Sequence, residues 1–172
     1  MKKLLCLILV VVAISLCGCS NKDTNEGISS AVVKEISCQE LLDKVLEKAE
    51  GLNTDSTLYY DAENYADFFE YLYNTSPDRA ADGAYAYASS AVADEVTIIL
   101  ASETDDVDVI KGHLEERIER RMQDFNGYKP EEVEKLENAV VDTYGRYVFM
   151  AVSENSQDII DIINEEIAKK DE

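Results

Sequence analysis

The sequence predicts an α+β fold: a four-stranded, mainly antiparallel sheet from two strand-strand-helix units, preceded by two N-terminal helices. Three observations predict this class. Segments with apolar residues every three or four positions are mixed with short segments of alternating or continuous hydrophobicity. Two pairs of strand-like segments are each followed by an amphipathic segment. Finally, the 172 residues leave room for one domain of ordinary size.

Two helices are expected at the start of the domain. The first spans residues 37–50, where apolar residues recur at helical spacing and Gly51 follows. Ser37 and Glu40 have the spacing of a capping box, which favours a helix beginning there. The second spans residues 62–73, and its apolar face is largely aromatic.

The strands and the remaining helices follow from a change of period at residue 84. They are expected in this order: strands over residues 84–88 and 95–101, a helix over 107–125, a helical turn over 131–137, strands over 139–143 and 146–153, and a helix over 159–167. The two inner strands are apolar on both faces, so helices must cover both faces of the sheet. We expect the two C-terminal helices on one face and the N-terminal helices over part of the other or over a sheet end.

Residues 1–18 have the composition of a signal peptide. Lys2 and Lys3 precede an apolar run that is shorter than the ~20 residues needed to span a bilayer. The segment that follows, Leu16-Cys17-Gly18-Cys19, resembles the lipobox of bacterial lipoproteins. The resemblance implies cleavage after Gly18 and a diacylglycerol thioether on Cys19. The alternative is an ordinary secretory signal with incidental cysteines.

The leader therefore divides the chain into three parts. These are the signal peptide over residues 1–18, a polar tether over 19–36 that begins with the lipidated Cys19, and a single α+β domain over 37–172. Two acyl chains give stable attachment to a membrane, where one chain gives only reversible binding. We expect the protein on the extracytoplasmic face of the cell membrane of a Gram-positive bacterium.

Charge excludes one class of partner. The chain has 16 Lys and Arg against 36 Asp and Glu, a formal net charge of −20. A field of this sign repels phosphate backbones, so nucleic-acid binding is not expected. Arg117, Arg120 and Arg121 lie close in sequence to Glu115, Glu116 and Glu119, and we expect them to form a solvent-exposed ion-pair face of the long helix.

Short motifs in the second half of the chain carry a family resemblance. They are Asp94–Leu100, Arg121–Phe125, Gly127–Pro130, Leu136–Ala139 and Gly145–Val148. Together they make residues 80–155 similar to domain of unknown function family 4358, found in small Gram-positive lipoproteins. The resemblance implies a fold and a lipid anchor, and it carries over no activity, cofactor or catalytic residue.

Catalysis would depend on a single thiol. Once the leader is removed and Cys19 is acylated, Cys38 is the only free cysteine, so neither an intramolecular disulfide nor a thiolate metal cluster is expected. One interpretation makes Cys38 a nucleophile with His113 as its base. The simpler interpretation is a small, half-buried residue in the first turn of a helix. We therefore assign no catalytic residue, no metal and no cofactor.

Tyrosine provides the candidate ligand surface, formed by Tyr59, Tyr60, Tyr71, Tyr85 and Tyr87. Tyrosines at a surface suit stacking on sugars or peptides. The alternative is that they pack between the N-terminal helices and the sheet. We expect a lipid-anchored, non-catalytic binding or accessory module that meets an envelope protein, a peptide or a glycan. The alternatives are an envelope hydrolase or thiol enzyme using Cys38, and a structural spacer.

Overall fold

The computed structural model describes residues 35–89 and 91–170, which belong to one unit of the chain, residues 32–172. The predicted signal peptide, Cys19 and residues 19–34 of the tether lie outside the described residues. Within them, no helix is both long and apolar enough to cross a membrane.

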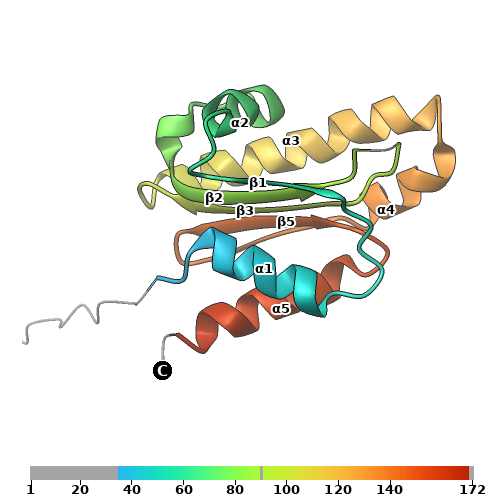
Figure 1. Ribbon diagram of the computed structural model, residues 1–172. Helices are drawn as coiled ribbons and strands as arrows, with labels where there is room; N and C mark the ends of the chain where they lie inside the picture. Colours follow the sequence, from blue (N-terminus) through green and yellow to red (C-terminus); the bar gives the residue numbers. More distant parts are fainter. Residues whose placement is uncertain (1–34, 90, 171–172) are drawn as a thin grey trace, which may run out of the picture. The chain divides into compact units, whose positions relative to one another are not determined.

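A single five-stranded sheet forms the centre of the domain, and every neighbouring pair of strands is antiparallel (Figure 1). The strands are β1 (Ser56–Tyr59), β2 (Ala80–Tyr87), β3 (Glu95–Ala101), β4 (Val140–Tyr144) and β5 (Tyr147–Val152). The helices are α1 (Cys38–Lys48), α2 (Tyr65–Tyr73), α3 (Asp106–Asn126), α4 (Val133–Glu137) and α5 (Ser156–Ala168), with 3₁₀ turns at Pro77–Arg79 and Pro130–Glu132. In the sheet the strands follow the order β1-β2-β3-β5-β4.

The predicted α+β class is confirmed, but the strand count was one too low. The missed strand, β1, has four residues and pairs with β2 at the edge of the sheet, from Ser56 opposite Tyr87 to Tyr59 opposite Ala84. Its segment lies between α1 and α2, so the two N-terminal helices are not consecutive elements. A strand this short, with only two apolar residues, does not produce a recognisable alternation.

The helices are divided between the two faces of the sheet differently from the expectation. On one face, α1 and α5 pack against alternate residues of β2, β3 and β5. On the other face, α2, α3 and α4 pack against the intervening residues. The two long C-terminal helices thus lie on opposite faces (Figure 1). Both faces of β3 and β5 are buried along their length, and neither α1 (11 residues) nor α2 (9 residues) is long enough to cover a face alone.

The start of α1 is fixed by two hydrogen bonds. The Ser37 hydroxyl accepts from the backbone N–H of Glu40 at 3.1 Å, which confirms the predicted cap. The backbone N–H of Cys38 donates to Asp82 on β2 at 2.8 Å. A carboxylate near the first free N–H groups of a helix also complements the helix dipole. The cap and this contact fix α1 on the sheet.

Candidate functional site

A cavity of about 510 Å³ lies where α2, the first 3₁₀ turn and the beginning of β2 meet. Its lining is aromatic, acidic and small, and the residues that matter for its chemistry are Tyr60, Glu63, Tyr65, Pro77, Asp78 and Ser102. No Lys or Arg of the described residues lines it. This set is called the Tyr60 pocket below.

Tyr60 forms the exposed aromatic wall of the pocket, with 43% of its surface exposed. Its ring centroid lies 5.2 Å from that of Tyr65, and its hydroxyl donates to the carbonyl of Ala80 at 3.3 Å. Tyr65 is buried and lies over Gly83, where an added Cβ would be 1.7 Å from the Tyr65 hydroxyl oxygen. A glycine in a strand often marks such a close approach. Gly83 is therefore required for the position of the inner wall.

Behind the pocket the aromatic contacts continue through the layer formed by α2 and β2. Tyr65 contacts Phe69, Phe69 contacts Tyr73 and Tyr73 contacts Tyr85, with ring centroids 5.8, 5.3 and 6.5 Å apart. Burial raises the pKa of Tyr73 and of Tyr85, so both hydroxyls stay protonated. These rings hold α2 on the sheet and support the pocket from behind.

The five predicted surface tyrosines take different positions. Tyr59 is half-buried on the α1 side, where its hydroxyl donates to Asp43 at 3.0 Å. Tyr71 is 83% exposed on α2, whereas Tyr85 is only 5% exposed. Tyr87 stacks on Tyr85 at 4.9 Å. The structure thus brings Tyr85 and Tyr87 together, and of the five only Tyr60 lines the pocket.

Two of the arginines expected at the surface are partly buried and form ion pairs with a buried carboxylate. Arg117 donates through Nε and Nη2 to the two oxygens of Glu95 at 2.6 and 2.8 Å, and Arg121 donates to the same carboxylate at 2.5 Å. The Glu95 side chain is fully buried. Arg117 also donates to the Tyr85 hydroxyl at 3.0 Å. The expectation of a solvated face was wrong for this pair because their partner is distant in sequence and lies at the start of β3.

Arg120, the third arginine of the group, differs from the other two in its exposure and in its partner. Arg120 is exposed, and its Nη2 donates to the backbone carbonyl of Leu72 in α2 at 2.6 Å. All three arginines therefore bind parts of the chain outside α3. They hold α3 against α2 and β3.

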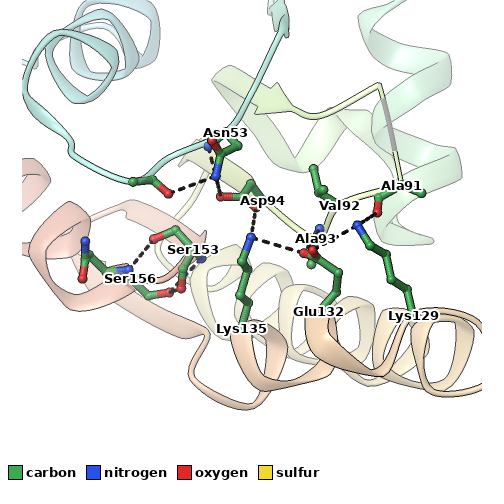
Figure 2. Close-up of polar contacts among 12 residues, drawn as sticks. Asn53, Ala91, Val92, Ala93, Asp94, Lys129, Glu132, Lys135, Ser153 and Ser156 are labelled. Atoms are coloured by element: carbon green, nitrogen blue, oxygen red, sulfur yellow. Dashed lines mark hydrogen bonds and ion pairs between the residues drawn. The ribbon is translucent and has the colours of Figure 1, made fainter.

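A second polar network surrounds Asp94, the residue before Glu95, and is shown in Figure 2. Its carboxylate accepts from Lys135 Nζ at 2.6 Å and from the backbone N–H of Asn53 at 3.0 Å. Lys135 also contacts Glu132 at 3.3 Å, and Glu132 accepts from the backbone N–H of Ala93 at 2.8 Å. Side chains of α4 and of the turn before it thus hold the segment that leads into β3.

The same segment is held by its carbonyl groups. Lys129 donates to the carbonyl of Ala91 at 2.9 Å, and Arg121 donates to those of Ala93 and Val92 at 2.9 and 3.2 Å. Together the two networks fix residues 91–95 on both sides. Among the described residues, no buried side-chain nitrogen or oxygen is without a hydrogen-bond partner. This arrangement indicates a structural clamp. It is called the β3 clamp below, and its side chains are those of Asp94, Glu95, Arg117, Arg121, Lys129, Glu132 and Lys135.

A smaller cavity of about 270 Å³ places Lys135 and Ser153 in one lining. Desolvation disfavours the charged form of Lys135, but its hydrogen bond and charge interaction with Asp94 raise its pKa overall. A lysine that stays protonated cannot take a proton from the Ser153 hydroxyl. That hydroxyl already accepts from the backbone N–H of Asn155 at 3.0 Å. The pair does not have the properties of a nucleophile and its base.

Cys38 and His113 are not brought together. Cys38 is fully buried in the layer of α1, on one face of the sheet. Burial, with a further contribution from the Asp82 carboxylate, raises the pKa of the Cys38 thiol well above its usual value. His113 lies on α3, on the opposite face, and contacts Glu116 at 3.3 Å. The geometry of a thiol nucleophile with this histidine as its base is therefore not formed.

Among the described residues, no group of three or more His, Cys, Asp or Glu side chains could hold a metal ion.

Comparison with known proteins gives a family and no relative of known activity. No curated protein and no solved structure matches the chain significantly. A family model described as a domain of unknown function (DUF4358) matches residues 54–153, from just before β1 to the end of β5. The match covers more than half of the chain and includes the Tyr60 pocket, so the chain belongs to the DUF4358 family.

Proposed function

We propose that the protein is a lipid-anchored, extracytoplasmic, non-catalytic binding module of the cell envelope, with the Tyr60 pocket as its ligand site. The lipobox-like segment ending at Cys19 supports the anchor and the extracytoplasmic side. The ligand would be a peptide, a glycan or an exposed segment of an envelope protein.

One observation carries the binding role: Tyr60, an exposed aromatic residue, lines a cavity. A cavity of about 510 Å³ is in the size range of ligand sites, and its aromatic and polar lining provides both contact area and orientation. The ring of Tyr60 is held by the hydrogen bond to Ala80 and by its contact with Tyr65, so little side-chain freedom is lost on binding.

The buried charges do not favour an enzyme. The side chains of the β3 clamp bind one another and the backbone, and none of them lines the Tyr60 pocket. Buried charged groups point to catalysis when they lie in a cleft and face a substrate. Here Glu95 and Asp94 are fully buried and paired, as expected of groups that stabilise the fold.

Site-specific photo-crosslinking on intact cells tests the binding role. A photoreactive amino acid at Ala66, an exposed residue of the pocket lining, is expected to capture a discrete partner. The matched control is the same amino acid at Asp158, exposed on α5 in the layer on the other face of the sheet. Capture from Ala66 and not from Asp158 supports the pocket. Equal capture from both positions, or none from Ala66, would favour the spacer alternative.

A further inference from the structure

The positive side chains of the domain are almost entirely occupied by the domain itself. Every Lys and Arg among the described residues contacts a carboxylate or a backbone carbonyl of the same chain. The contacts are the ion pairs of Lys44, Lys48, Arg79, Lys111, Arg117, Arg121, Lys129, Lys135, Arg146, Lys169 and Lys170, and the hydrogen bond of Arg120 to Leu72. An anionic ligand would have to displace one of these partners.

The Tyr60 pocket has the opposite charge pattern. Glu63 and Asp78 both line it, both are exposed, and neither is in an ion pair with a Lys or Arg of the described residues. The nearest arginine in sequence, Arg79, pairs instead with Asp106 at the start of α3. The pocket therefore offers two free carboxylates beside an exposed aromatic ring.

We propose that the Tyr60 pocket binds a cationic side chain, the ammonium group of lysine or the guanidinium group of arginine, presented by a peptide segment of the partner. This inference rests on the proposed binding function and names the chemistry of its ligand. A cation over the face of Tyr60 gains from the negative face of the ring, and Glu63 and Asp78 supply the counter-charges. The chain's net charge of −20 also attracts a basic segment and speeds its approach.

Small residues give the bound segment space. Ala62, Ala66, Ala80 and Ala81 complete the lining, and none of them extends beyond a methyl group. The hydroxyl of Ser102 is already used, since it donates to the carbonyl of Asp78 at 2.9 Å. Specificity in the pocket thus comes from Tyr60 and the two carboxylates, and it is a specificity for charge.

Calorimetric titration of the purified full chain with penta-lysine tests the inference. Binding is expected to weaken about tenfold in the Glu63→Gln/Asp78→Asn variant, as two exposed ion pairs are lost. The matched control is Asp158→Asn/Glu165→Gln, which removes the same charge from α5 and is expected to change the affinity less than twofold. Penta-glutamate should not bind.

The outcomes separate this inference from the binding function. Equal weakening in both variants would mean that penta-lysine follows the diffuse acidic field, and it would overturn the assignment to the pocket. No binding of penta-lysine, or binding of penta-glutamate, would overturn the cationic ligand. In either case, the photo-crosslinking experiment at Ala66 still tests whether the pocket binds a different ligand.

Discussion

Replacing Glu95 with alanine is expected to lower the free energy of unfolding by about 3–5 kcal/mol. The substitution leaves Arg117 and Arg121 without their shared carboxylate. The side chains of both arginines are less than one-fifth exposed, so water cannot fully replace it. Removing one partner of a buried ion pair leaves an uncompensated charge in a poorly solvated place, which costs more than the pair itself contributes. Urea unfolding followed by circular dichroism measures the change.

The control for this variant is Glu119→Ala, an exposed carboxylate on α3 that should change the stability by no more than about 0.5 kcal/mol. The triple variant Glu95→Leu/Arg117→Met/Arg121→Leu is expected to recover part of the loss, because apolar residues of similar volume can replace a buried ion network. Recovery is incomplete because the carbonyl of Ala93 loses its hydrogen bond from Arg121. A Glu95→Ala variant as stable as the parent would show that the β3 clamp does not stabilise the fold.

Replacing Gly83 with alanine is expected to destabilise the protein by about 1–3 kcal/mol and to weaken ligand binding at the same time. The new Cβ would lie 1.7 Å from the hydroxyl oxygen of Tyr65 and 2.6 Å from its Cζ, so the ring must move. Tyr65 is the inner wall of the Tyr60 pocket and contacts the ring of Tyr60 at 5.2 Å. The displacement therefore changes the pocket as well as the core.

Gly112→Ala is the matched control, because a Cβ at Gly112 meets nothing within 4 Å. Gly112 is inside α3, where alanine should stabilise the helix by up to about 1 kcal/mol. Thermal unfolding and penta-lysine titration of both variants give the two readouts. Unchanged stability and affinity in Gly83→Ala would contradict the close contact between Tyr65 and β2.

The order of elements after residue 80 could be predicted because its signals are local. Strands β3 and β5 are short continuous apolar runs, and α3 and α5 have apolar residues at helical spacing. The distribution of helices over the two faces could not be predicted, because it depends on which side of the sheet each connection turns to. No single segment contains that information, and both faces of β3 carry buried apolar residues.

The buried ion pairs and the Tyr60 pocket could likewise be predicted only in part from the sequence. Local charge spacing suggested that Arg117 and Arg121 pair within α3, but their partner Glu95 is 22 and 26 residues away. The available signal was Glu95 itself, with Asp94, at the head of an otherwise apolar strand, where a buried carboxylate needs a partner. The aromatic content around Tyr60 pointed to a ligand surface, yet the cavity arises only when α2 and the start of β2 meet.

The most direct test of the binding function compares an exposed tyrosine inside the pocket with one outside it. Tyr60 lines the pocket, whereas Tyr71 is 83% exposed on α2 and does not line it. The measurement is the yield of photo-crosslinks from position 66 on intact cells, with Tyr60→Ala and Tyr71→Ala introduced separately. The expected result is loss of the crosslink with Tyr60→Ala and an unchanged yield with Tyr71→Ala. An equal yield in both variants would contradict a ligand site at Tyr60.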